Sequence, residues 1–171
     1  MRRTLTLLAA LAGALVVGSA PSSSRAGASV PCDLRLKFGS HSEQPVGQFR
    51  VSLIFVNGRY EAPCRVSGFP DVELIGPVYR TYGSIYGLPD QVGRSRSAVL
   101  QPGQSAHAVL TWLRPSRRAD RWVPGYIRAV VPTNRGPSLP MALPWHFGAV
   151  LRQDAATHPG TYVGPLRPGT G

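Results

Sequence analysis

The residues best suited to chemistry in this sequence form a basic run beside a tryptophan. Arg114, Arg117, Arg118 and Arg121 lie close together, and Trp122 follows directly. A guanidinium presents a planar fork of donors that matches phosphate and carboxylate oxygens, and an exposed indole can stack on a sugar or base. The run therefore predicts a site for an anionic ligand. The alternative is a solvated loop beside a buried Trp122.

A second stretch combines aromatic and basic side chains. Tyr79, Arg80 and Tyr82 precede Tyr86 in a region rich in Gly, Ser and Arg. If this stretch and the Arg114–Trp122 run lay at one end of the fold, they would form one basic, aromatic patch. The sequence alone does not place them together.

The two cysteines, Cys32 and Cys64, are the only ones in the chain. They lack Cys-x-x-Cys spacing, and both fall at inward-facing positions of expected strands, which argues against a redox or nucleophilic role. In an exported protein such a pair most simply forms one disulfide. Closing a loop of about 30 residues would stabilise the fold by roughly 3–4 kcal/mol in the chain-entropy model.

The remaining polar residues do not form a recognisable catalytic or metal-binding pattern. The four histidines lack metal-ligand spacing, and they are His41, His107, His146 and His158. Asp71 and Glu73 could share one strand face, but two carboxylates without supporting groups do not make a glycosidase. Phosphate-binding loops, dinucleotide fingerprints and nucleophile elbows do not occur. We therefore predict a protein that is not an enzyme and uses no metal or cofactor, with a hydrolase of unrecognised site as the alternative.

Residues 1–28 have the pattern of a cleaved secretory signal. Arg2 and Arg3 precede an apolar run over 5–17, which is expected to be helical, and a small-residue site over 26–28 follows. A helix needs about 20 apolar residues to cross a bilayer, and this run is shorter. We therefore expect cleavage rather than a retained membrane anchor. The predicted product is a secreted or envelope-associated single domain, residues 29–171, without a transmembrane span.

The chain is strongly basic, with 19 Lys and Arg against 8 Asp and Glu. Cleavage would remove three arginines and leave a formal charge of about +8. Nearly all the basic residues are Arg, and Ala, Gly and Pro are abundant, which is typical of a GC-rich genome. The same charge would suit a surface that meets anionic polymers. Specific nucleic-acid binding is not expected of an exported protein, although weak binding at low salt would follow from the charge.

The elements expected to position these residues are all β. Alternating or continuously apolar runs predict strands over 33–38, 48–57, 64–66, 72–75, 98–100, 105–113, 126–131 and 161–163, with an edge strand within 139–145. Loops are expected over 39–47 and 79–96, and the Gly/Pro-rich tail is expected to fray. Gly68-Phe69-Pro70 reads as a corner between two strands. Seven to nine short strands with this spacing indicate an antiparallel β-sandwich.

Four segments together resemble the exported actinobacterial family called domain of unknown function 4232. They are Cys32-Asp33-Leu34, a strand ending at Asn57, the stretch Cys64–Val72 with its Gly-Phe-Pro, and Val99–Ala106 with its Leu-Gln-Pro-Gly-Gln. The resemblance covers residues 32–131, and the second cysteine pair of many family members is absent. It implies an immunoglobulin-like sandwich and no established activity.

These patterns predict a secreted, non-enzymatic binding or interaction module of the bacterial envelope. Its partner would be an anionic cell-wall polymer or an envelope protein. A purely structural envelope domain is the alternative.

Overall fold

The computed structural model describes residues 32–58, 61–79, 83–116, 121–153 and 160–171. The predicted signal peptide, residues 1–28, lies outside them. The described residues form thirteen β-strands and one short 3-10 turn, η1 (Pro45–Gly47). Four strands have only two residues, and the other nine match the seven to nine short strands that the sequence predicts. Within the described ranges, no helix is long and apolar enough to cross a membrane.

The first antiparallel sheet, sheet A, contains the longest strands. Its order is β1-β2-β7-β12, and β13 also pairs with β7. The bounds are β1 Leu34–Gln44, β2 Gln48–Asn57, β7 Ser105–Leu113, β12 Tyr162–Val163 and β13 Arg167–Pro168. The central position of β2 agrees with its apolar character on both faces.

Two further antiparallel sheets of four strands each complete the fold. Sheet B has the order β10-β9-β3-β6, with bounds β10 Gly136–Pro137, β9 Pro132–Thr133, β3 Cys64–Val66 and β6 Ala98–Leu100. Sheet C has the order β11-β8-β4-β5, with bounds β11 Met141–Pro144, β8 Tyr126–Val130, β4 Asp71–Tyr79 and β5 Gly83–Gly87.

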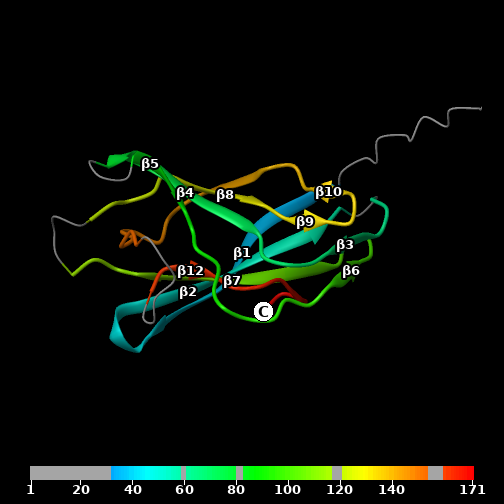
Figure 1. Cartoon of the computed structure of the whole chain (residues 1–171), viewed down its shortest axis with the longest axis horizontal. Coiled ribbons are helices and arrows are strands. Elements are labelled where there is room, and N and C mark those ends of the chain that lie inside the picture. The colour runs from blue at the N-terminus through cyan, green and yellow to red at the C-terminus, as the bar shows by residue number, and fades with distance from the viewer. Residues whose placement is uncertain (1–31, 59–60, 80–82, 117–120, 154–159) are drawn as a thin grey trace, which may run out of the picture.

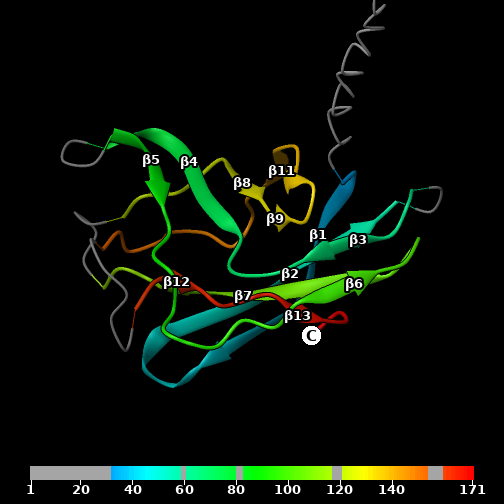
Figure 2. The same ribbon diagram turned by 45° about the vertical axis from the view of Figure 1, so that its right-hand side comes forward.

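Sheets B and C are two parts of one bent layer. The chain passes from β3 in sheet B to β4 in sheet C, and it passes back from β8 to β9 next to this crossing, because Val66 pairs with Thr133 and Asp71 with Val130. The bend lies at the predicted corner, where Gly68 has a φ of 86° that favours glycine. Figures 1 and 2 show this layer facing sheet A. The fold is therefore an antiparallel β-sandwich, as predicted.

The core lies between the layers. Alternate residues of β2 and β7 point inward from sheet A, and alternate residues of β3, β4 and β8 meet them from the other side. The side chains at the centre are fully buried, and they include Val51, Leu53, Phe55, Val66, Val72, Leu74, Ala106, Ala108, Leu110, Trp112, Ile127 and Ala129. The period-two pattern of the sequence thus identifies the faces of the long strands correctly.

Three predicted loops or ends are wrong. The expected loop over 39–47 belongs largely to β1, which continues to Gln44 after an irregularity between Phe38 and His41. The expected loop over 79–96 contains β5, which pairs with β4. Strand β4 does not stop at Gly76-Pro77 but continues to Tyr79, with its register shifted after Ile75.

The C-terminal tail is also ordered, contrary to the predicted fraying. Leu166 is fully buried, and its backbone NH donates to the carbonyl of Gly68 at 2.9 Å. The next residue, Arg167, pairs with His107 of β7, and the NH of Gly169 donates to the carbonyl of Ser105. The tail is held because one apolar side chain anchors it while its backbone extends sheet A.

Candidate anion-binding site

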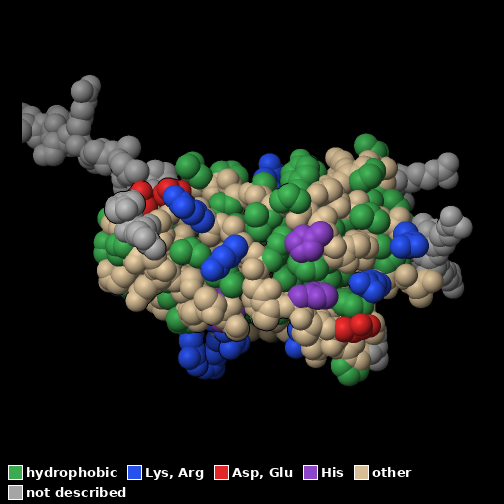
Figure 3. Space-filling model, turned by 180° about the vertical axis from the view of Figure 1, so that it is seen from behind, with side chains coloured by type: hydrophobic (Ala, Val, Ile, Leu, Met, Phe, Trp, Pro, Cys, Tyr) green, Lys and Arg blue, Asp and Glu red, His purple; other side chains and the backbone are tan. Residues whose placement is uncertain are grey.

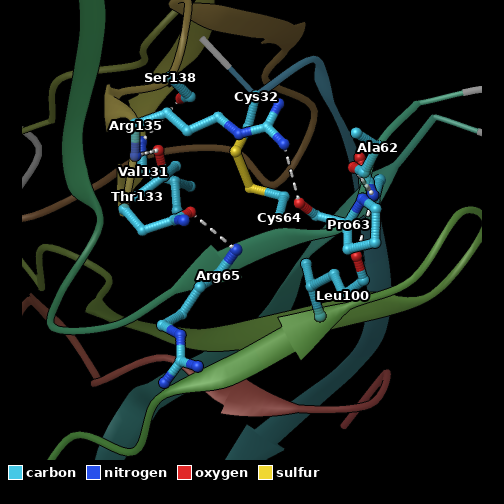
Figure 4. Close-up of a disulfide and its surroundings, with 12 residues drawn as sticks. Cys32, Ala62, Pro63, Cys64, Arg65, Leu100, Val131, Thr133, Arg135 and Ser138 are labelled. Carbon is cyan, nitrogen blue, oxygen red and sulfur yellow. Dashed lines mark hydrogen bonds between the residues drawn. A yellow bond between two sulfur atoms is a disulfide. The ribbon is translucent and has the colours of Figure 1, made fainter. Parts of the chain in front are cut away.

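The predicted disulfide between Cys32 and Cys64 is confirmed (Figure 4), with a distance of 5.9 Å between the Cα atoms. Both cysteines are buried. Cys32 lies two residues before the start of β1 in sheet A, and Cys64 begins β3 of sheet B, so the bond ties the two layers of the sandwich together. The role of this pair in the structure is architectural.

The strand end at Asn57 joins the other segments on which the family resemblance rests. This fully buried side chain donates from Nδ2 to the carbonyls of Ala62, at 3.0 Å, and Leu100, at 2.9 Å. Its backbone exchanges two hydrogen bonds of 2.9 Å with the turn before β7, at Gly103 and Gln104. Asn57 therefore satisfies one carbonyl in the loop before β3 and one at the end of β6, and its role is to hold the frame.

Two arginines brace the frame at the same end, Arg135 through its side chain and Arg65 through its backbone. The guanidinium of Arg135 donates to the carbonyl of Pro63, next to the disulfide, at 3.2 Å (Figure 4). The backbone NH of Arg65 donates to the side chain of Asn134 at 3.1 Å. These contacts tie the β9–β10 turn to β3.

The predicted basic run beside Trp122 is only partly described. Arg117 and Arg118 lie outside the described residues. Arg114 is exposed, with its guanidinium 4.0 Å above the ring centre of Phe49, and Arg121 is exposed. Trp122 is only 3% exposed, and its indole NH donates to the carbonyl of Pro77 at 2.9 Å. The alternative with a buried Trp122 is the one observed, so this indole offers no stacking surface.

The structure brings part of the second aromatic stretch against the first. The rings of Tyr86 and Trp122 are 6.4 Å apart, edge to face, and both are buried. Arg152 covers both rings, at 5.1 and 4.7 Å from their centres, and donates to the carbonyls of Gly83 and Ile85. The contact is thus a capped part of the core rather than an open patch. Arg80 and Tyr82 lie outside the described residues.

The histidines occupy two separate surfaces. His41 and His146 both contact the ring of Phe147, at 5.1 and 4.2 Å, beside a cluster that includes Trp112 and Trp145. Figure 3 shows two neighbouring histidines among hydrophobic side chains. His107 instead lies on the outer face of sheet A, and His158 is outside the described residues. Within the part of the chain that is described, no group of three or more potential ligands could hold a metal ion.

The carboxylates do not converge on a catalytic arrangement in the described residues. Glu73 pairs with the guanidinium of Arg128 across β4 and β8, with Nε at 2.7 Å from the carboxylate. The pKa of Asp90 is raised, first by partial burial and then by the nearby charge of Asp71. Among the described residues, neither Glu73 nor Asp90 forms a hydrogen bond with a histidine or with a hydroxyl group that could act as a nucleophile.

A polar pocket lies on the outer face of sheet A, and we call it the basic pocket. Its volume is about 270 Å³. Arg50 of β2, His107 and Thr111 of β7, and Arg167 of β13 line it, together with Gln91, Val109, Gly164 and Pro165. Two guanidiniums and an imidazole thus surround one small cavity, and neither guanidinium makes an ion pair with a described residue.

Strand register explains how these side chains meet. Arg50 pairs with Thr111 across β2 and β7, and Arg167 pairs with His107 across β13 and β7. Paired residues project from the same face of a sheet. The imidazole of His107 is also held by a contact of 3.3 Å between Nδ1 and the carbonyl of Gly169.

Two more basic residues lie on the same outer face. Lys37 pairs with Ile54, which pairs with His107, so one row of the sheet runs from Lys37 to Arg167. Arg35 lies two residues before Lys37 on β1 and has the same orientation. The acid of β1, Glu43, pairs with the core residue Phe49 and therefore belongs to the opposite face. Figure 3 shows one group of basic side chains at the lower left, with others scattered over the face in view.

Sequence reasoning places Arg50 and His107 on outward faces but does not combine them into a site. Arg167 is missed because it falls in the tail that was expected to fray. The one available signal is Leu166, an isolated apolar residue among Gly and Pro that anchors the tail.

These features define a class of protein: a small antiparallel β-sandwich closed by one disulfide, with a basic outer face. The chain belongs to the family described as "Domain of unknown function (DUF4232)", which matches residues 31–166. The match extends past residues 32–131, where the sequence resemblance lay, and includes β12 and the anchor Leu166. No curated protein and no solved structure matches the chain.

Proposed function

We propose that this protein is an exported, non-enzymatic binding module of the bacterial envelope that binds an anionic polymer through the outer face of sheet A.

 The observation that carries the proposal is the set of basic side chains that share this face: Arg35, Lys37, Arg50, His107 and Arg167.

Electrostatics supports this surface over the others. Within their bounds, β1, β2 and β7 place no acidic side chain on the outer face of sheet A, so the basic residues there outnumber the one acid beside them, Asp33, which directly precedes β1. A polymer with repeated negative charges gains from several such cations at once and releases counterions when it binds. The export pattern of residues 1–28 and the disulfide both suit an envelope location. The Arg-, Ala-, Gly- and Pro-rich composition favours an actinobacterial source.

A salt series on an anionic resin tests the proposal. The purified protein should be retained on a poly(glycerol phosphate) or polyuronate resin at about 20 mM salt and should elute as the screening length falls at higher salt. The variant Arg35→Ala/Lys37→Ala should elute at lower salt than the wild type. The control Arg65→Ala/Arg96→Ala removes the same charge from exposed positions outside sheet A. Equal shifts for the two variants, or no retention of the wild type at low salt, would refute the proposal.

A purely structural envelope domain is the second candidate, and one observation favours it. The segments shared with the family are explained by the frame itself, because Asn57 and the disulfide tie strands together. Under this alternative, the charge would serve solubility, and the two variants above would behave alike.

A further inference from the structure

We propose that the basic pocket holds one tetrahedral oxyanion, the phosphate group of a phosphodiester-linked polymer. This inference rests on the proposed function and specifies its ligand. The pocket would seat a single phosphate, while Lys37 and Arg35 meet neighbouring charges of the same polymer.

The size of the pocket favours a group rather than a whole ligand. Its volume of about 270 Å³ lies below the about 300–1,000 Å³ that is typical of sites for drug-sized molecules. A phosphate with its adjoining ester atoms is smaller than a sugar residue. The pocket is therefore large enough for one phosphate with its adjoining atoms, and the rest of the polymer would lie outside.

The arrangement of donors favours tetrahedral over planar geometry. Arg50 comes from β2, His107 and Thr111 come from β7, and Arg167 comes from the C-terminal strand β13. One guanidinium fork can satisfy both oxygens of a planar carboxylate. A phosphate group offers oxygens in several directions, so it can use donors from three strands at once.

None of the described residues that line the pocket is acidic. Arg128 pairs with Glu73, and Arg152 donates to two backbone carbonyls, whereas Arg50 and Arg167 make no ion pair with the described residues. Asp90 adjoins the pocket residue Gln91, and its pKa is raised first by partial burial and then by the charge of Asp71. Two like charges around one cavity repel each other, and a bound anion would turn that repulsion into attraction.

The C-terminal segment completes the pocket. Gly164 lies in its wall, where a Cβ would come within 3.4 Å of the Val109 carbonyl oxygen and 3.6 Å of Gln91 Oε1. The buried Leu166 then sets the position of Arg167. Because Arg167 reaches the pocket only when this segment is docked on β7, ligand binding should stabilise the docked segment.

The pocket contains no Trp, Tyr or Phe side chain on which a nucleobase could stack. We therefore assign the phosphate to a polyol phosphate polymer rather than to a nucleic acid.

Binding to matched polymers tests the assignment. Poly(glycerol phosphate), polygalacturonate and single-stranded DNA of similar charge would be compared by titration at one salt concentration. We expect poly(glycerol phosphate) to bind about tenfold more tightly than polygalacturonate, since charge-assisted bonds to two guanidiniums contribute selectivity. It should also bind more tightly than the DNA. Inorganic phosphate should shift the NMR signals of Arg50 and Arg167, and acetate should not.

Two variants separate fork geometry from charge. Arg50→Lys/Arg167→Lys keeps the charge but removes the forks, so it should lose the preference for phosphate while keeping salt-dependent retention. Arg35→Lys/Arg65→Lys is the matched control and should keep the preference. Thermal unfolding would verify that all variants fold.

The outcomes separate this inference from the proposed function. Salt-dependent binding with equal affinity for the phosphate polymer and polygalacturonate would overturn the phosphate assignment and leave the proposed function standing. Tighter binding of the DNA would also overturn the assignment to a polyol phosphate. Failure of the wild type to bind any of the polymers at low salt would overturn both.

Discussion

The outer faces of sheets A and C differ in how their charges are balanced. On sheet C, Arg128 is neutralised by Glu73 on the neighbouring strand. On sheet A, Arg50 and Arg167 flank a cavity and make no ion pair with the described residues. All three arginines lie on paired strands of the same sandwich, so they differ in their charged neighbours rather than in their secondary structure. Net charge alone therefore does not identify a candidate site, and a cavity lined by arginines that make no ion pair with described residues is the better guide.

The apolar residues sharpen the same contrast. Ile85, Ile75, Tyr126 and Pro144 are paired in one row across sheet C. Ile85 and Tyr126 in this row are exposed. The corresponding outer face of sheet A carries a row with Lys37, His107 and Arg167. One face is thus apolar around a closed ion pair, and the other is polar and basic.

The largest expected effect comes from the disulfide that links the two layers of the sandwich. Replacing both cysteines, Cys32→Ser/Cys64→Ser, should lower the free energy of unfolding by about 3–4 kcal/mol, because the unfolded chain regains the entropy of an open loop. Urea denaturation measures the loss. The fraction that remains folded should still bind anionic polymer through sheet A.

Reduction of the wild type is the control for this change. A reductant should lower the stability of the wild type by a similar amount and leave the double variant unchanged. If the double variant is as stable as the oxidised wild type, the bond does not hold the layers together as argued here.

A smaller effect should distinguish the two faces directly. Arg128→Ala removes the partner of Glu73, and because this pair is partly exposed we expect a loss of about 0.5–1 kcal/mol in the free energy of unfolding. Arg50→Ala removes no ion pair and should change stability by less than about 0.5 kcal/mol. Urea denaturation at low and high salt would compare them.

Polymer binding should show the reverse order. Arg50→Ala should weaken retention on an anionic resin more than Arg128→Ala does. Similar losses of stability and of retention in both variants would remove the distinction between the faces.

The sequence predicts the strands whose pattern is local. The alternation over 48–57 and 105–113 identifies the inward faces of β2 and β7, and the inward parity of Cys32 and Cys64 agrees with their disulfide. Gly68 marks the bend because few other residues accept its backbone conformation. These features depend on side-chain period and backbone sterics, which a sequence displays directly.

The elements that the sequence does not predict depend on distant partners. β5 contains three small or flexible residues, Gly83, Ser84 and Gly87, and it forms because β4 pairs with it while Tyr86 packs on Trp122. Tertiary contacts override weak strand propensity there.

The basic pocket is unpredictable for the same reason. Parity shows that Arg50 and His107 point outward, but it does not show which strands are neighbours or in what register. Arg167 enters the site through its pairing with His107, which lies 60 residues earlier in the sequence. The predicted run around Arg114 was easier to see because its residues are adjacent in sequence, although burial of Trp122 removes its stacking surface.

The smallest expected effect concerns Asp90, at the margin between the two faces. Its pKa lies above the ordinary value of 3.8, first because of partial burial and then because of the charge of Asp71. The folded chain therefore binds this proton more tightly than the unfolded chain. The associated stability is complete below pH 3.8 and is lost as the pH rises through the pKa of the folded state. At neutral pH, the ionised Asp90 slightly disfavours folding.

Asp90→Asn should accordingly raise the unfolding temperature slightly at pH 7, and the difference from the wild type should disappear in acid. Thermal unfolding between pH 3 and pH 7 measures this, with Glu43→Gln as a control that adds the same net positive charge elsewhere. Because the chain is already basic, the general effect of added positive charge is destabilising. A rise for Asp90→Asn without one for Glu43→Gln would therefore show a local cause. A fall in both would mean that net charge, rather than the burial of Asp90 and the charge of Asp71, governs stability at this margin of the sandwich.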